Sequence, residues 1–123
     1  MNGLLTIHDG VRFSGALIGS DAYNKGRLVL FRGPFDPQFL LTDPSTRDQI
    51  ILSTEPVLGS VGVRKGVDQS DRIFASGLVC REVIDFPTYY VYYKNLGDML
   101  KRNRISALTF LDTDAIEKFA LNE

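Results

Sequence analysis

The sequence is poor in cysteine, in histidine and in long apolar runs. Cys80 is its only cysteine and His8 its only histidine. A lone cysteine excludes a disulfide within the chain, and one residue of each type supplies too few ligands for a usual zinc site. The longest apolar stretches, such as LVLF at residues 28–31, are far too short to cross a bilayer. We therefore expect no metal site, no cofactor and no association with a membrane.

An excess of charge of one sign is also missing. The 14 Lys and Arg residues nearly balance the 15 Asp and Glu residues, which leaves a formal net charge of -1. A protein that coats nucleic acid usually carries a basic excess, so nucleic-acid binding is not favoured, although a local basic patch would still permit it. The opening MNGLLTIHDG lacks the basic start and long apolar core of a secretory signal. These features predict a soluble cytoplasmic protein.

The composition that remains is that of an ordinary globular protein. Hydrophobic residues make up 44% of the chain and charged residues 24%, which are typical values for a folded domain. The length also matches one domain. We expect residues 1–123 to form a single globular domain.

Short apolar runs separated by glycine and proline occupy most of the chain up to residue 87, a pattern typical of short strands joined by turns. Asp9-Gly10 lies between LLTIH and VRF and predicts a hairpin, because this dipeptide readily takes the positive φ angles of a tight turn. The further strands that we expect are RLVLFR, QFLLT, QIILS, RIFAS with LVCREVI, interrupted by a bulge at Gly77, and the tyrosine-rich segment described below.

Helical periodicity begins only near the carboxyl end. NLGDMLKRN predicts a short amphipathic helix, and ISALTFL after it predicts a buried strand. Asp114 and Glu117 have the spacing of a capping box, which predicts a last helix with Asp114 as its cap. The expected fold is therefore α+β: a mostly antiparallel sheet of about six to eight short strands with two short C-terminal helices.

The most distinctive segment is FPTYYVYYKN, residues 86–95. Side chains alternate along a strand, so Tyr90 and Tyr92 share one face, while Tyr89 and Tyr93 share the other. One face packs on the core, and the other either reaches water through its hydroxyl groups or contacts a partner. Because tyrosine is enriched at interfaces, the segment predicts a homo-oligomer contact, with stacking of a base or sugar ring as a second role.

Basic residues that suit an anion occur in two places. Arg64 and Lys65 lie in GSVGVRKG, which fails the Walker pattern because the lysine precedes the last glycine. Arg102 and Arg104 lie at the end of the first predicted helix, where cations also balance the helix dipole. A surface turn and a stabilised helix end are the simpler interpretations, and anion binding is the functional one.

Acidic residues offer a weaker signal. Asp112 and Asp114 follow a predicted strand, where paired carboxylates often hold a divalent ion, and His8 is a candidate general base. Helix capping explains both acids more simply. Cys80 falls in an apolar strand and is expected to be a core residue. We therefore predict no catalytic residue.

Three hypotheses follow for the function. The first is a non-enzymatic binding module that self-associates through the tyrosine segment. The second is a binder of a small anionic, nucleotide-like ligand or of nucleic acid, in which tyrosine stacks and arginine or lysine neutralises phosphate. The third is a small metal-dependent hydrolase that uses Asp112, Asp114 and His8.

Overall fold

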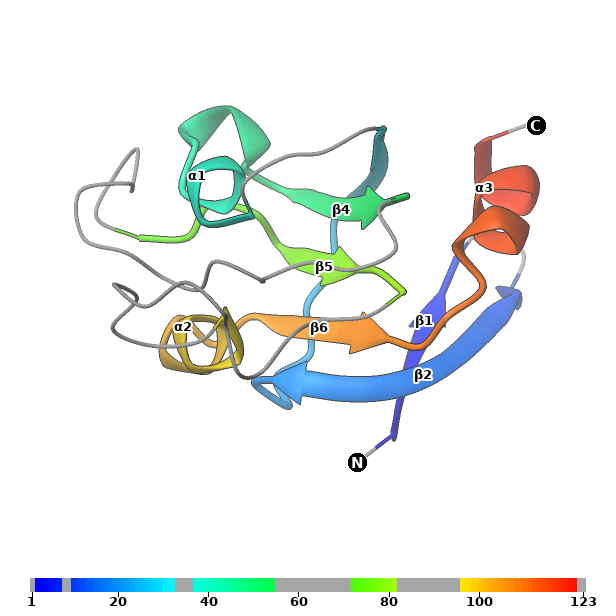
Figure 1. Ribbon diagram of the computed structural model, residues 1–123, viewed down its shortest axis with the longest axis horizontal. Coiled ribbons are helices and arrows are strands. Elements are labelled where there is room, and N and C mark those ends of the chain that lie inside the picture. The colour runs from blue at the N-terminus through cyan, green and yellow to red at the C-terminus, as the bar shows by residue number, and fades with distance from the viewer. Residues whose placement is uncertain (1, 8–9, 33–36, 55–71, 82–95, 122–123) are drawn as a thin grey trace.

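The computed structural model describes residues 2–7, 10–32, 37–54, 72–81 and 96–121. The elements in chain order are β1 (Asn2–Thr6), β2 (Arg12–Gly19), β3 (Arg27–Phe31), α1 (Pro37–Leu41), the 3-10 turn η2 (Pro44–Thr46), β4 (Gln49–Ser53), β5 (Gly77–Val79), α2 (Leu96–Arg102), β6 (Ser106–Thr109) and α3 (Thr113–Leu121). These strands form one six-stranded sheet in the order β1-β2-β6-β5-β4-β3 (Figure 1).

The sheet is mixed. β2 pairs antiparallel with β1 and with β6, whereas the β3–β4, β4–β5 and β5–β6 pairs are all parallel. The prediction of a mostly antiparallel sheet is therefore wrong, and three short α-helices rather than two occur in the part of the chain that the structure describes. Parallel neighbours need crossover connections, and α1 and α2 lie in two of them. Local sequence signals do not reveal which strands will pair.

The segment QFLLT illustrates why one helix was missed. The sequence predicts a strand there, but Pro37–Leu41 form α1. Proline suits the first position of a helix because its missing N–H needs no partner there. The Thr42 hydroxyl donates to the carbonyl oxygen of Gln38 (2.8 Å) at the carboxyl end of the turn. A run of four or five apolar residues does not distinguish a strand from a buried helix.

Several local predictions are confirmed. The β1–β2 hairpin places Thr6 opposite Arg12, and Gly10 has the positive φ of 75° that the turn requires. Strands form at Arg27–Phe31 and Gln49–Ser53, and a helix forms at Leu96–Arg102. By contrast, of the long strand predicted around Gly77, the described part, residues 72–81, is a strand only at Gly77–Val79.

The reason is that residues before β5 bond elsewhere. The N–H groups of Phe74 and Ala75 both donate to the carbonyl oxygen of Leu41 at the end of α1 (2.9 and 3.4 Å). This contact ties the chain to the helix rather than to the neighbouring strand, so the extended pairing begins only at Gly77. The expected bulge is absent from this described part of β5 because no strand precedes it.

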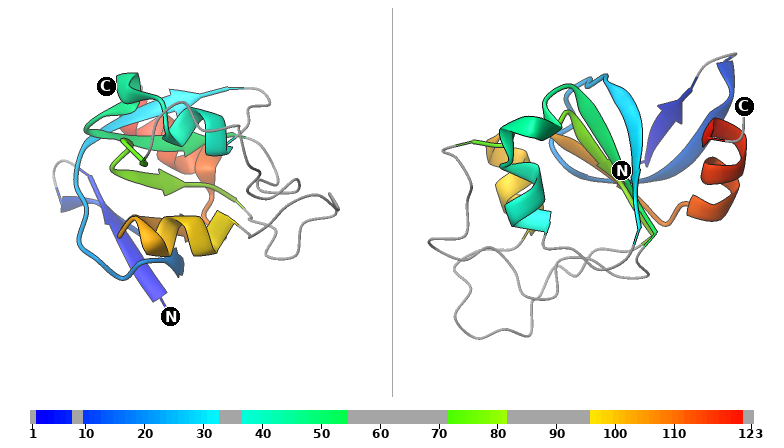
Figure 2. Two further views of the ribbon diagram at one scale, coloured as in Figure 1. Left: turned by 90° about the vertical axis from the view of Figure 1, so that its left-hand side faces the viewer. Right: turned by 90° about the horizontal axis from the view of Figure 1, so that it is seen from above.

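Two hydrophobic clusters lie on opposite faces of the sheet. Alternate residues of each strand enter different clusters: Ile51 faces one and Leu52 the other, as do Leu78 and Val79. The first cluster lies under α1 and α2, and the second lies under α3 and the curled β1–β2 hairpin. Figure 2 shows this division, with α1 and α2 on one side of the sheet and α3 on the other.

No helix in the ranges that the structure describes is both long and apolar enough to span a membrane. The tyrosine segment and the GSVGVRKG loop fall in residues 82–95 and 55–71, which lie outside the described residues. The predictions for Tyr89, Tyr90, Tyr92, Tyr93, Arg64 and Lys65 therefore stay predictions.

Candidate functional site

The carboxyl ends of the parallel strands meet at one edge of the sheet, next to α3 (Figure 1). We call this the carboxyl edge and define it by Arg32, Arg81 and Phe110, which follow β3, β5 and β6. The opposite end, where the same strands begin, is the amino edge. We define it by Asn24, Arg47, Arg72 and Arg104, which lie in the connections that lead into those strands.

Two arginines of the carboxyl edge hold α3. The Arg81 guanidinium donates from Nε to the Thr113 hydroxyl (2.8 Å) and from Nη2 to a carboxylate oxygen of Asp114 (2.6 Å). Arg32 forms an ion pair with Glu117, one turn further along the helix. Thr113 is fully buried, so its bond to Arg81 is shielded from water, whereas the Arg81–Asp114 pair is largely exposed. The helix is thereby fixed to the ends of β3 and β5.

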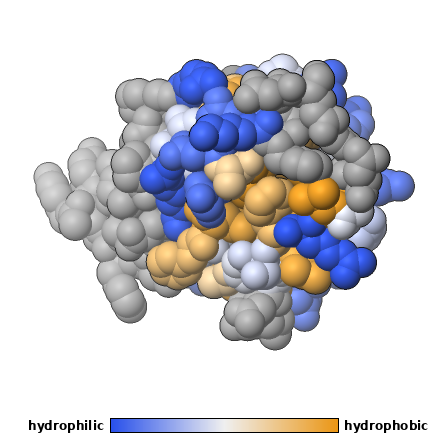
Figure 3. Space-filling view, turned by 90° about the vertical axis from the view of Figure 1, so that its right-hand side faces the viewer, coloured by the Kyte–Doolittle hydropathy of each residue, from blue (hydrophilic) through white to orange (hydrophobic). Residues whose placement is uncertain are grey.

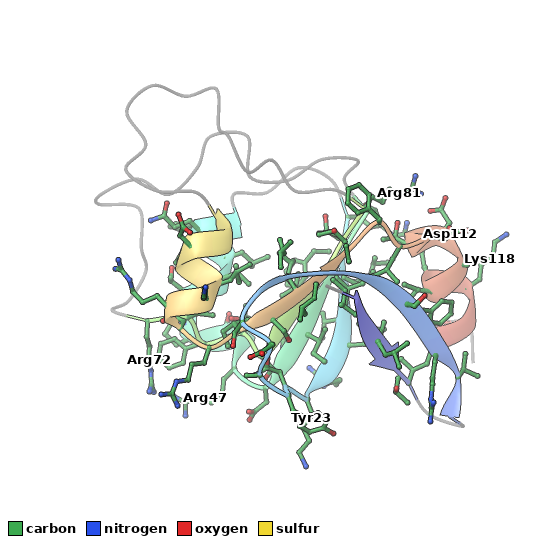
Figure 4. All side chains as sticks on the ribbon, turned by 90° about the horizontal axis from the view of Figure 1, so that it is seen from below. Tyr23, Arg47, Arg72, Arg81, Asp112 and Lys118 are labelled. Atoms are coloured by element: carbon green, nitrogen blue, oxygen red, sulfur yellow. The ribbon has the colours of Figure 1, made fainter. Side chains whose placement is uncertain are left out.

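Asp112 caps α3. Its carboxylate accepts from the Ala115 N–H (3.1 Å), and its carbonyl oxygen accepts from the Ile116 N–H (3.2 Å). The interpretation of Asp112 as a capping residue is confirmed, but the choice of Asp114 as the cap is wrong, because the helix begins at Thr113. No group of three or more His, Cys, Asp and Glu side chains suited to a metal occurs among the described residues. Figure 4 shows Asp112 close to Arg81 at the start of the helix.

Phe110 is the unusual residue of the carboxyl edge. It has a φ of 61°, in the left-handed region, and its side chain is 71% exposed. Its N–H donates to the carbonyl oxygen of Arg81 (2.6 Å). The sequence predicts a buried strand over residues 105–111, but β6 ends at Thr109, so this part of the prediction is wrong. Apolar periodicity carries no signal for a left-handed residue, which is why Phe110 was missed.

Cys80 lies at the same edge but in the core. It is fully buried, and its thiol contacts the carbonyl oxygen of Leu108 (Sγ to O, 3.7 Å). Burial raises the pKa of the Cys80 thiol to about 12, because the thiolate would lose its hydration. The thiol is therefore protonated at neutral pH and unsuited to act as a nucleophile, and the prediction of a core cysteine is confirmed.

A pocket of about 460 Å³ lies at the amino edge, between the connection of residues 20–26 and the sheet. Asn24 forms part of its wall and bonds to Ser106, accepting from the main-chain N–H (3.0 Å) and from the hydroxyl (2.7 Å). Asp21 and Lys25 at the rim are both exposed, so water screens their charges. None of the buried polar side chains of the described residues lines this pocket. The pocket has the size of a small-molecule site, but its described lining does not define a ligand.

Two arginines of the amino edge share one aromatic ring. The guanidinium groups of Arg47 and Arg72 lie over the ring of Phe74, at 5.1 and 4.6 Å from its centre. The chain after α2 contacts the same region, because the Asn103 side chain accepts from the N–H of Ile73 (3.3 Å). Figure 4 shows Arg47 and Arg72 side by side, at the end of the molecule away from Arg81.

The structure describes two of the four residues predicted to bind an anion. Arg102 and Arg104 are both exposed, at the end of α2 and just after it. Their predicted partners Arg64 and Lys65 lie outside the described residues, so a joint anion site stays a prediction.

The comparison with protein families shows the family of the chain. Residues 5–121 match the family described as carbamoyl-phosphate synthase small chain, CPSase domain. The chain belongs to this family.

Individual small chains of carbamoyl phosphate synthase are similar over almost the whole chain. The chain is 32% identical to that of Clostridium acetobutylicum over 118 residues, which cover 96% of this chain and 34% of the relative. It is 36% identical to that of Pectobacterium atrosepticum over 110 residues, covering 89% and 29%, and 36% identical to that of Thermosynechococcus vestitus over 115 residues, covering 94% and 30%. The chain therefore spans about a third of the length of the curated relatives that it matches.

Membership of the small-chain family corrects the functional hypotheses. The relatives are components of an enzyme, so the main hypothesis of a non-enzymatic, self-associating module is wrong. A stand-alone anion binder and a small metal-dependent hydrolase do not describe a synthase small chain either, and Asp112 and Asp114 serve α3 instead. The sequence analysis did not reach this result, because the family is recognised by similarity over residues 5–121 rather than by any one of the short patterns considered there.

Proposed function

We propose that this chain acts as the CPSase domain of a carbamoyl phosphate synthase small chain and takes part in forming carbamoyl phosphate. The observation that carries the proposal is the extent of the family match, which runs from the end of β1 to the last residue of α3 and includes the whole of β2 to β6. A small chain implies a larger companion chain, and we propose that chain as the partner.

The chemistry of the described side chains supports a binding role within the enzyme. At the carboxyl edge Asp112 caps a helix, Asp114 pairs with Arg81, and Thr113 accepts a bond in the core. The Cys80 thiol is buried and protonated. Since these groups are engaged in holding the fold, we propose that the chain contributes to the synthase by binding and positioning the companion chain.

Three further expectations accompany this proposal. We propose that residues 1–123 fold as one domain, that the protein is cytoplasmic, and that the contact surface extends to the tyrosines and basic residues predicted from the sequence: Tyr89, Tyr90, Tyr92, Tyr93, Arg64, Lys65, Arg102 and Arg104. In this interpretation the partner is a different chain rather than a second copy.

The test is reconstitution with the large chain of a carbamoyl phosphate synthase from the same organism. Size-exclusion chromatography with light scattering should detect a complex that contains both chains at micromolar concentration. The rate of carbamoyl phosphate formation by the large chain should change when this chain is added, with the large chain alone as the control. Absence of a complex at tens of micromolar, together with an unchanged rate, would refute the proposal.

A further inference from the structure

Phe110 is unfavourable for this chain by itself in two respects. A φ of 61° crowds the Cβ atom of any residue other than glycine, and an aromatic side chain has no local hydrogen bond that compensates. With 71% of its surface exposed, the ring also gains little from burial in the chain's own core. Among the residues that the structure describes, neither backbone conformation nor packing explains a phenylalanine at this position.

The backbone nevertheless holds the ring in a defined place. Thr109 and Leu111 on either side are buried, with 2% and 6% exposure. The N–H of Phe110 is bonded to the carbonyl oxygen of Arg81, whose side chain is itself fixed by Thr113 and Asp114. A projecting ring on an anchored backbone loses little conformational entropy when it binds, which favours affinity.

The surrounding surface is apolar. Figure 3 shows apolar side chains framed by hydrophilic ones on the side of the molecule that carries α3 and the carboxyl edge. Half-buried Ile7 and Phe13, at the end of the β1–β2 hairpin, pack against the same core cluster as Ile116 of α3. Leu111, the residue after Phe110, belongs to this same cluster, so the Phe110 backbone is joined directly to it.

We propose that Phe110 is the anchor by which this chain binds the large chain of the synthase, with its ring inserted into an apolar pocket of that chain. This inference rests on the proposed function, which supplies the partner. Aromatic residues that project from a fixed backbone are typical of binding hot spots, and burial in the partner would compensate for the unfavourable conformation and exposure of the ring. The Arg81–Asp114 pair beside it would form part of the polar rim.

The decisive variant is Phe110→Gly, because it should move affinity and stability in different directions. Removing the ring should weaken binding to the large chain by a factor of about 30 or more, as expected for a hot spot. Glycine suits a positive φ, so the melting temperature should stay the same or rise. Calorimetric titration of the large chain and thermal unfolding of the free variant give the two values. Phe110→Asn, which also tolerates this φ, tests whether the loss follows the ring rather than the added backbone freedom.

Asp48→Gly is the matched control. Asp48 is exposed and has a φ of 62°, but it lies before β4 at the amino edge. Its replacement should have a similar effect on the melting temperature and no effect on affinity for the large chain.

The outcomes separate this inference from the proposed function. If the wild-type chain binds the large chain and both Phe110 variants bind equally well, the anchor is refuted while the proposed function stands. If the wild-type chain does not bind at all, both fall. The anchor is also refuted if the Phe110 variants dissociate a homodimer, or release another part of a small chain, while their affinity for the large chain is unchanged.

Discussion

The two edges of the parallel strands use their polar side chains differently. At the carboxyl edge, Arg32 and Arg81 form ion pairs with Glu117 and Asp114 of α3. These pairs hold α3 against the second hydrophobic cluster, which it shares with the β1–β2 hairpin. At the amino edge, the main polar contact is made to the main chain: the Asn24 side chain accepts a hydrogen bond from the N–H of Ser106. Arg47 and Arg72 at this edge lie over the ring of Phe74.

This difference predicts where each edge is sensitive to mutation. Exposed ion pairs contribute little to stability, so α3 should depend on its buried residues more than on its arginines. A side chain that satisfies a main-chain N–H should matter more, because its removal leaves a donor unpaired. Mutations of the buried residues of α3 should therefore destabilise the carboxyl edge most, and mutation of Asn24 should destabilise the amino edge most.

Ile116→Ala should have the largest effect. Ile116 is a fully buried residue of α3, and its truncation leaves a cavity in the second cluster. Loss of about 2–5 kcal/mol from the free energy of unfolding is expected for such a change. Urea denaturation gives the value, with Leu4→Ala, at a 60% exposed position, as the apolar control. A loss no larger than that of the control would show that α3 does not depend on this core.

Asn24→Ala tests the amino edge. The substitution leaves the Ser106 N–H without its acceptor and should lower the free energy of unfolding by about 1–2 kcal/mol. Ser106→Ala removes only the hydroxyl bond to the same amide and should cost less. Equal losses for the two variants in urea denaturation would mean that the main-chain bond is not the important one.

How far the sequence predicts these edges depends on the range of the interactions. The hairpin at Gly10, the strand Gln49–Ser53 and the helix Leu96–Arg102 follow from signals within a few neighbouring residues, and all three were predicted. The parallel pairing was missed, because it depends on crossover connections that contact distant parts of the chain. α1 was missed because a short apolar run fits both a strand and a helix.

The candidate site was predicted less well than the fold. Asp112 was recognised as a capping residue, but Arg81 acts through contacts 32 and 33 residues away in the chain, which no local pattern reveals. Phe110 was assigned to a buried strand, since nothing in ISALTFL indicates where the strand ends and the backbone turns left-handed.

The Cys80 thiol makes the carboxyl edge sensitive to alkaline pH. Burial raises the pKa of Cys80 from 9.0 to about 12, so the unfolded chain loses this proton at a lower pH than the native one. The stability from this group is fully present below pH 9 and is lost as the pH rises towards 12. At pH 10 the loss should be about 1.4 kcal/mol.

The measurement compares the pH dependence of unfolding for the wild-type chain and for Cys80→Ala. The variant lacks the thiol, while the tyrosines and lysines that also titrate in this range are unchanged. The wild-type curve should therefore fall more steeply between pH 9 and 10. Parallel curves would mean that the native thiol ionises as easily as the unfolded one.

The smallest effect is expected for two carboxylates at the amino end of α3, Asp112 and Asp114. Asp112 satisfies the Ala115 N–H at the first turn, so Asp112→Ala should lower the free energy of unfolding by about 1 kcal/mol. Asp114→Ala removes an exposed ion pair with Arg81 and should cost less, about 0–1 kcal/mol, and still less in high salt. Because both residues carry the same charge near the same helix end, their dipole contributions are similar and the difference reports the capping bond itself. Urea denaturation in 1 M salt gives the comparison, because the Debye length of about 3 Å there weakens the exposed ion pair. If Asp114→Ala were the more destabilising change under these conditions, the assignment of Asp112 as the cap would be wrong.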